Sequence, residues 1–95
     1  MKQYHVYILL CSDGSYYTGI TNDIERRLSE HQAGVNTMCY IYKRRPVTLV
    51  FNEVFPDATS AIAFEKQVKG WRRAKKEAII KGDWHLLPGL SRTAK

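Results

Sequence analysis

The segment 4–21 constrains the fold more than any other part of the chain, because it carries the pattern of a β-hairpin. Residues 4–11 and 15–21 are both rich in aromatic and β-branched side chains, which favour strands. Between them lies Asp13-Gly14, a dipeptide typical of tight turns. The pattern therefore predicts two antiparallel strands joined by a short loop.

The length of this loop decides whether Tyr7 and Tyr17 lie on the same face of the hairpin. A two-residue loop at Asp13-Gly14 would place them on opposite faces, because side chains alternate along a strand. A three-residue loop over 12–14, ending in a left-handed glycine, would place both phenols on one face. We favour the three-residue loop. Gly19 would then pair with Tyr7 and leave a hollow through which a ligand could reach the tyrosine ring.

A short basic helix is predicted directly after the hairpin. Asn22 or Asp23 can cap its first turn, because a short side-chain oxygen accepts hydrogen bonds from unpaired backbone N–H groups. Gly34 offers a stop after about three turns.

The helical periodicity predicts which side chains of this helix face the sheet. Ile24 and Leu28 mark the buried stripe, Arg27 and His31 lie close to it one turn apart, and Arg26 points away. We therefore expect a guanidinium and an imidazole to lie near the two phenols of the hairpin. In the alternative interpretation the tyrosines are ordinary strand residues, and the arginine and histidine only border the core.

Composition predicts one basic globular domain. The chain has 95 residues, 44% of them hydrophobic, and its 15 Lys and Arg against nine Asp and Glu give a net charge of +6. This charge favours nucleic acid over an anionic membrane as partner. No apolar run approaches the length of a membrane span or of a signal-peptide core, so we expect a cytoplasmic protein. Cys11 and Cys39 lack metal-ligand spacing and are predicted to be reduced thiols.

The segment 35–46 has no clean periodicity and is predicted to be a long loop with a basic end. Tyr40 and Tyr42 could stack on bases while the neighbouring cations contact phosphates. Alternatively, Tyr40 or Ile41 packs into the core beneath a solvated basic tip. The three cations are Lys43, Arg44 and Arg45.

A third strand and two further helices are predicted after this loop. Residues 47–55 form a nearly continuous apolar run, which suits the central or best-covered strand. Asp57, Thr59 or Ser60 can cap the next helix, and Gly70-Trp71 can separate it from a last helix over 72–81. The apolar stripe of the first of these helices consists of Ala61, Phe64, Val68 and Trp71.

Glu65 borders this apolar stripe within an otherwise basic helix. It could pair with Lys69 one turn later, or it could hold a divalent metal, since Mg²⁺ accepts one or two carboxylates together with water and phosphate oxygens. The surrounding cations are expected to face phosphates, although such a run can also be a solvated face. These cations are Lys69, Arg72, Arg73, Lys75 and Lys76. We assign 1–82 to one domain and 83–95 to a tail in which Trp84 and Leu86 could dock on the core.

Two tripeptides of the hairpin resemble the motifs of the GIY-YIG nuclease superfamily. His5-Val6-Tyr7 is similar to the first motif and Tyr17-Thr18-Gly19 to the second. His5 stands at the glycine position of the first motif, and Ile20 stands where several members carry a lysine. The resemblance extends over residues 4–80 and is greatest to the small single-domain bacterial members. The residues that match the family's further site positions are Arg27, His31 and Glu65.

This resemblance implies an α+β fold, in which helices flank a three-stranded antiparallel sheet in the order β-β-α-β-α-α. It also implies metal-dependent hydrolysis of a nucleic-acid phosphodiester, with DNA favoured over RNA, in DNA repair or processing. By analogy with the family, Glu65 would hold one Mg²⁺ or Mn²⁺ and Arg27 would stabilise the phosphate. Tyr7 would position or deprotonate water with assistance from His31, and Tyr17 would bind phosphate.

Two other classes of function remain open at this point. A non-catalytic nucleic-acid-binding module would keep the basic loop and helix but would not need Glu65 near Arg27. A protein–protein adaptor would instead require a broad exposed apolar patch.

Overall fold

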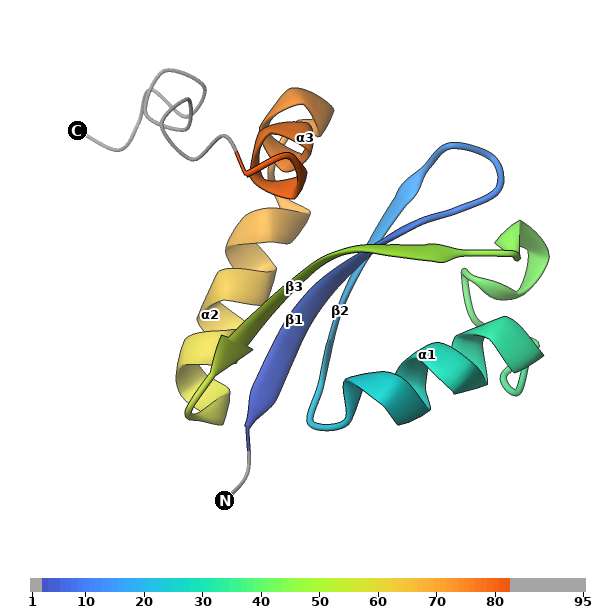
Figure 1. Cartoon of the computed structure of the whole chain (residues 1–95), viewed down its shortest axis with the longest axis horizontal. Coiled ribbons are helices and arrows are strands. Elements are labelled where there is room, and N and C mark those ends of the chain that lie inside the picture. The colour runs from blue at the N-terminus through green and yellow to red at the C-terminus, as the bar shows by residue number, and fades with distance from the viewer. Residues whose placement is uncertain (1–2, 83–95) are drawn as a thin grey trace.

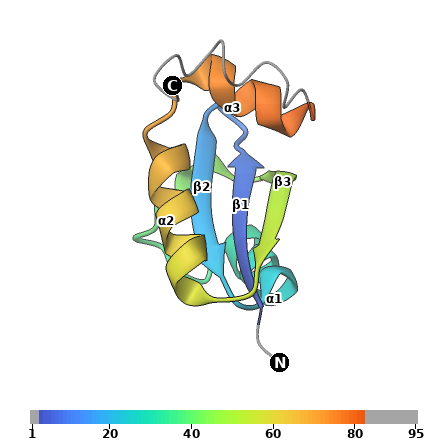
Figure 2. The same ribbon diagram turned by 90° about the vertical axis from the view of Figure 1, so that its left-hand side faces the viewer.

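The computed structural model describes residues 3–82, which form a three-stranded antiparallel sheet between helices (Figure 1). The strand order is β2-β1-β3. Helix α1 covers one face of the sheet, and α2 and α3 lie on the other (Figures 1 and 2). The predicted α+β class and the order β-β-α-β-α-α are confirmed. The elements are β1 (Tyr4–Leu10), β2 (Tyr16–Thr21), α1 (Ile24–Ala33), the 3-10 helix η1 (Tyr42–Arg44), β3 (Thr48–Phe55), α2 (Ala58–Lys69) and α3 (Arg73–Ile80).

The β1–β2 hairpin turns through the predicted three-residue loop. The Cys11 N–H donates to the Ser15 carbonyl at 2.8 Å, and the N–H of Gly14 donates to the Cys11 carbonyl at 2.9 Å. Gly14 has φ 86°, the left-handed conformation that glycine adopts without steric cost. Tyr7 consequently pairs with Gly19, and the residues two positions away, Leu9 and Tyr17, pair with each other. Tyr7 and Tyr17 therefore lie on the same face, as the loop length predicts.

The central and best-covered strand is β1, so the expectation of a central or best-covered third strand is wrong. β3 pairs with β1 alone, and much of its surface stays partly or fully exposed, whereas residues 6–9 of β1 are at most 1% exposed. The long apolar run of β3 has another cause. A bulge at Val50 lets Leu49 pack toward α1 and Phe51 toward α2, so β3 contributes apolar side chains to both faces.

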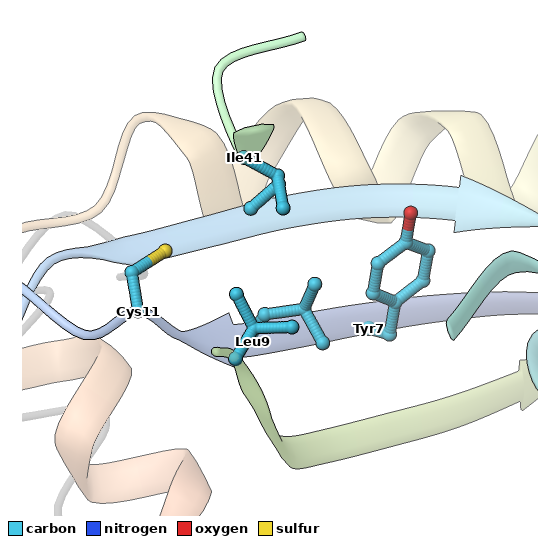
Figure 3. Packing of buried hydrophobic residues seen from close by; sticks show 5 residues of the cluster. Tyr7, Leu9, Cys11 and Ile41 are labelled. Carbon is cyan, nitrogen blue, oxygen red and sulfur yellow. The ribbon is translucent and has the colours of Figure 1, made fainter. Parts of the chain in front are cut away.

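The α1 side of the sheet holds a compact core that the loop 35–46 completes. Ile41 of the loop is 1% exposed and packs with Tyr7, Leu9 and Cys11 (Figure 3). The alternative in which Ile41 enters the core is therefore confirmed, while Tyr40 remains 44% exposed. The loop also contains the short helix η1.

The helix boundaries follow the capping signals of the sequence. Asp23 accepts from the Arg26 N–H at 3.1 Å and Asp57 from the Ser60 N–H at 2.7 Å, and Gly34 ends α1 with φ 72°. On the far face Ile8, Val68 and Ile79 form the buried cluster, with Phe64 and Trp71 packed against it.

Three further expectations concern the cysteines, membrane-spanning helices and the C-terminal tail. Cys11 and Cys39 are free thiols, as predicted, and Cys11 is buried. Within residues 3–82, no helix has the length and apolar character needed to cross a membrane. Trp84, Leu86 and the rest of the tail 83–95 lie outside the described residues.

Candidate active site

A buried hydrogen bond links β1 to α1 at the base of the candidate site. The Tyr7 hydroxyl lies 3.1 Å from His31 Nε2, and the two residues are 1% and 9% exposed. Burial lowers the pKa of His31, and the charge of Arg27 lowers it further, so the imidazole is neutral at pH 7. Which of the two groups donates depends on the imidazole tautomer.

The space above Gly19 is filled by the protein itself, so the predicted hollow beside Tyr7 is wrong. A Cβ atom at position 19 would overlap the hydroxyl and ring carbons of Tyr7. The missing side chain therefore makes room for the phenol, and no ligand can enter there. Burial raises the pKa of Tyr7 to about 12, and Arg27 opposes this rise without cancelling it. Tyr7 is thus a neutral phenol at physiological pH.

Tyr17 lies between the buried pair and the surface. Its ring makes an edge contact with His31 at 5.5 Å between centroids and stacks on Tyr40 at 5.9 Å with 23° between the planes. The Tyr7 ring is 6.4 Å away. Burial raises the pKa of Tyr17, while the positive charges of Lys69 and Arg27 work against that rise.

A pocket of about 330 Å³ opens beside these rings, and it is lined by Tyr17, Arg27 and His31 together. Arg27 is partly exposed there, whereas Arg26 points away with 60% of its side chain exposed, as predicted. Tyr7 lies behind the pocket wall and reaches it through His31. The other lining residues are Glu30, Gly34, Val35, Asn36, Cys39, Ile41 and Tyr42.

Glu30 is the site residue that the sequence analysis missed. Its carboxylate lies 3.3 Å from Arg27 Nε and 3.9 Å from Arg26 Nε, and it lines the same pocket. The spacing of three residues from Arg27 on one helix was a signal for this contact. The negative charge of Glu30 also raises the pKa of His31, against the larger effects of burial and Arg27.

Glu65 lies on α2, the helix on the opposite face of the sheet, and is not among the residues that line the pocket. β2 is an edge strand, so α2 side chains can act on Tyr17 around that edge, and the pKa of Tyr17 responds to both Glu65 and Lys69. Glu65 Oε2 lies 2.9 Å from Lys69 Nζ, with side chains 13% and 56% exposed. The hydrogen bond to Glu65 raises the pKa of Lys69. The simpler of the two partners considered for Glu65 is therefore present.

The donor set around Glu65 fits a metal that the protein holds with one carboxylate. Within residues 3–82, no group of three or more His, Cys, Asp or Glu side chains could enclose an ion. Mg²⁺ does not need such a group, because it commonly keeps several waters and binds substrate phosphate oxygens. Lys69 would have to move aside to free the Glu65 oxygen.

Many of the predicted phosphate-binding cations have partners within the protein. Arg44 lies 3.8 Å above the Tyr40 ring and 3.0 Å from Asp13, while Arg45 lies 4.5 Å above the Tyr42 ring. Each of these tyrosines therefore already has a ring face covered, which disfavours base stacking in this conformation. Arg73 bonds Glu77 and the Gly14 carbonyl, Lys75 lies over Trp71, and burial lowers the pKa of Lys76. Lys43 and Arg72 are exposed.

The site therefore combines a neutral tyrosine–histidine pair with an arginine-lined pocket, on a hairpin followed by a helix. The model of the GIY-YIG catalytic domain matches residues 3–78, and the chain belongs to this family of nuclease domains.

Similar proteins are found in archaea and bacteria. A UPF0213 protein of Halobacterium salinarum is 46% identical over 77 residues, which cover 81% of this chain and 99% of the relative. One of Staphylococcus saprophyticus is 40% identical over 80 residues, covering 84% and 96%. Among solved structures, the solution NMR structure of the Bacillus halodurans UPF0213 protein BH0048 is 40% identical with a TM-score of 0.55 over 83% of each chain. That of the Enterococcus faecalis protein EF2693 is 39% identical with a TM-score of 0.62 over 90% of each chain.

Proposed function

We propose that this protein is a metal-dependent endonuclease that hydrolyses nucleic-acid phosphodiesters, with DNA favoured over RNA, in cytoplasmic DNA repair or processing. The observation that carries the proposal is the convergence of Tyr17, Arg27 and His31 on one pocket. Glu65 and Lys69 lie close enough to influence the same tyrosine. Membership in a nuclease domain family supports this interpretation.

The residues of the pocket have distinct roles in the proposed reaction. Arg27, partly exposed in the pocket, binds the phosphate and stabilises the charge that develops on it. Reaching the phosphate requires Arg27 to loosen its contact with Glu30, a partly exposed ion pair that is readily exchanged. Tyr17 contributes a neutral phenol that donates a hydrogen bond to a phosphate oxygen.

Proton transfer is assigned to the Tyr7–His31 pair. A phenol with a pKa of about 12 cannot lose its proton to water at neutral pH. His31 lines the pocket and Tyr7 lies behind its wall, so the neutral imidazole is the group that can accept a proton from the attacking water. In this arrangement His31 is the proton acceptor, and the Tyr7 hydroxyl at 3.1 Å holds the imidazole in place.

Glu65 is the proposed ligand for one Mg²⁺ or Mn²⁺. A bound ion would act as a Lewis acid toward the leaving oxygen. Without the ion, Lys69 neutralises the carboxylate by the contact at 2.9 Å. Lys69 then becomes available to a phosphate when the carboxylate changes partner.

The decisive experiment combines metal dependence with the substitution Glu65→Gln. We expect the wild-type protein to cut single-stranded, duplex or branched DNA in Mn²⁺ or Mg²⁺, and Glu65→Gln to lower cleavage on the order of 100-fold or more. Affinity for DNA and the thermal midpoint should change little, because the remaining cations supply the phosphate contacts. Glu53→Gln on β3 is the matched control, because it removes an exposed carboxylate elsewhere. Wild-type cleavage by Glu65→Gln would exclude Glu65 as the metal ligand.

The ion pair with Lys69 favours one alternative, a non-catalytic nucleic-acid-binding module. In that case Glu65 would only restrain Lys69, and the buried phenol of Tyr7 would be structural. Such a module would bind DNA equally well with and without Mg²⁺ and would cut none of the three DNA forms. The same assay therefore separates the two functions.

We propose that the exposed cations Lys43 and Arg72, together with Lys69, contact backbone phosphates of the nucleic acid outside the pocket. Replacing Lys43 and Arg72 by glutamine should reduce the slope of log affinity against log salt by about two units in total. An unchanged slope would remove both residues from the nucleic-acid-binding surface.

A further inference from the structure

A closed ring of four side chains joins the loop 35–46 to the tip of the hairpin, beside Tyr17. The Tyr40 hydroxyl donates to Ser15 Oγ at 3.0 Å, and the Ser15 hydroxyl donates to Asp13 Oδ1 at 2.6 Å. Arg44 Nε donates to Asp13 Oδ2 at 3.0 Å, and the Arg44 guanidinium lies 3.8 Å above the Tyr40 ring. We call these four residues, Asp13, Ser15, Tyr40 and Arg44, the loop clasp.

Two hydrogen bonds to backbone carbonyls support the loop clasp, and the first of them joins the loop to the hairpin. The Ser12 N–H donates to the Arg44 carbonyl at 2.9 Å, and an Arg44 terminal nitrogen donates to the Tyr40 carbonyl at 2.9 Å. Ser15 and Tyr17 are two residues apart near the start of β2, so their side chains leave the hairpin on the same side. Tyr40 can therefore donate its hydroxyl to Ser15 and at the same time stack its ring on Tyr17.

Tyr40 is the residue through which the loop clasp acts on the site. The Tyr40 ring stacks on Tyr17, and the Arg44 guanidinium also packs against the Tyr40 ring. Tyr17 is thus held between Tyr40 and the edge of His31, with centroid distances of 5.9 and 5.5 Å. If Tyr40 were absent, the outer side of Tyr17 would lose its neighbour and the ring would gain rotamer freedom.

We propose that the loop clasp positions Tyr17 for phosphate binding, with Tyr40 as a positioning residue and Arg44 as the cation that holds Tyr40 in place. This inference rests on the proposed function and assigns Arg44 a role different from direct phosphate contact. The rate of a reaction depends strongly on the position of the reacting groups, and a displacement of about 1 Å can reduce the rate about 100-fold. A stacked ring is a means of preventing such a displacement without touching the substrate.

The neighbouring lysine provides a control for charge. Lys43→Gln and Arg44→Gln each remove one positive charge from η1, but only Arg44 contacts Tyr40 and Asp13. We expect Arg44→Gln to weaken DNA binding no more than Lys43→Gln does, because Asp13 already pairs with the Arg44 guanidinium. Only Arg44→Gln should also lower kcat, by about threefold to tenfold. Tyr40→Leu should lower kcat by about tenfold while KM changes less than about twofold.

A readout independent of cleavage follows the Tyr17 phenol itself. In protein labelled with ¹³C at the tyrosine Cζ, Tyr40→Leu should move the Tyr17 titration toward that of an ordinary tyrosine, because its ring gains solvent. Arg44→Gln should move the Tyr17 titration in the same direction but by a smaller amount. Lys43→Gln should leave the Tyr17 titration unchanged. Thermal midpoints of all variants separate a loss of positioning from a loss of fold.

Each outcome decides between positioning and charge. If Arg44→Gln and Lys43→Gln give the same kcat and the same Tyr17 signal, Arg44 acts only through its charge and the proposal is overturned. If the wild-type protein cuts no DNA, the proposed nuclease function fails, and the Tyr17 titration alone decides the role of the loop clasp. If Tyr40→Leu does not fold, Tyr40→Phe and Asp13→Asn replace it. Unchanged Tyr17 signals in both would overturn the proposal.

Discussion

The two faces of the sheet bury different chemistry. Toward α2 and α3 the buried cluster is apolar, with Ile8, Val68 and Ile79 each at most 2% exposed. Toward α1 the core contains a phenol and an imidazole, Tyr7 and His31, joined at 3.1 Å. Burying apolar surface stabilises a fold without any directional requirement. A buried polar atom stabilises it only while its partner is present.

This difference separates the stabilising role of one face from the chemical role of the other. The apolar face holds α2, the helix that carries Glu65, against the sheet. The polar face holds the groups that could bind phosphate and accept a proton. We therefore expect substitutions on the apolar face to change stability alone, and those on the polar face to change stability, its pH dependence and activity together.

The largest expected change in stability comes from the apolar face. Val68→Ala removes two methyl groups from a fully buried position and should lower the free energy of unfolding by about 2 kcal/mol. The measurement is urea unfolding at pH 7, where the residual cleavage per folded molecule should match the wild type. Ile62→Ala on the same helix is the control, because Ile62 is 42% exposed and its loss should matter little. Equal effects of both substitutions would contradict the assignment of Val68 to the core.

A smaller loss is expected on the polar face. Tyr7→Phe removes the hydroxyl and leaves His31 Nε2 without its partner, which should lower the free energy of unfolding by about 1–2 kcal/mol. Unlike Val68→Ala, it should also abolish cleavage. Tyr4→Phe on the same strand is the control, since Tyr4 is only partly buried. Full cleavage by Tyr7→Phe would exclude a role for the Tyr7 hydroxyl in catalysis.

The two faces should also differ in pH dependence. The pKa of His31 is lowered by burial, so the folded protein binds a proton less readily than the unfolded chain. Stability is therefore complete above the usual histidine pKa of about 6.5 and falls as the pH decreases through it. Unfolding in urea between pH 8 and pH 5 should show this slope in wild type and in Val68→Ala. The slope should flatten in His31→Gln, and a persistent slope there would assign it to another group.

The loss of stability at alkaline pH depends on the pKa of Tyr7 in the same way. Its folded pKa of about 12 lies above the usual tyrosine pKa of about 10, so the folded state retains the proton that the unfolded chain loses. The contribution is present below pH 10 and is lost as the pH rises toward 12. Tyr7→Phe should remove this part of the alkaline transition, and an unaltered transition would show that other groups cause it.

The smallest expected effect has the opposite sign. Thr18 pairs with Ile8, is 5% exposed, and its hydroxyl is the one buried side-chain N or O atom without a hydrogen-bond partner within residues 3–82. Thr18→Val keeps the shape and removes that atom, so it should be neutral or stabilising by up to about 1 kcal/mol. Thr21→Val is the control, because the Thr21 hydroxyl accepts from the Asp23 N–H at 3.1 Å, and its loss should destabilise. Destabilisation by Thr18→Val would indicate an undetected partner.

Local signals in the sequence determined much of the fold. The three-residue turn, the caps Asp23 and Asp57, the left-handed stop at Gly34 and the break after α2 all lie where the pattern predicts them. Each depends on residues within a few positions of one another, where backbone sterics and capping hydrogen bonds act regardless of the rest of the chain. The shared face of Tyr7 and Tyr17 follows from the same local register.

Only the tertiary structure decided how distant segments fill space around those elements. β3 lies at the edge because it pairs with β1 alone, and a bulge divides its apolar run between the two cores. The Tyr7 ring occupies the gap at Gly19, and Arg44 stacks on Tyr40 across from Asp13. Long side chains can reach many partners, and periodicity gives their direction but not their contacts. Those contacts depend on segments tens of residues away, whose positions are set when the whole core packs.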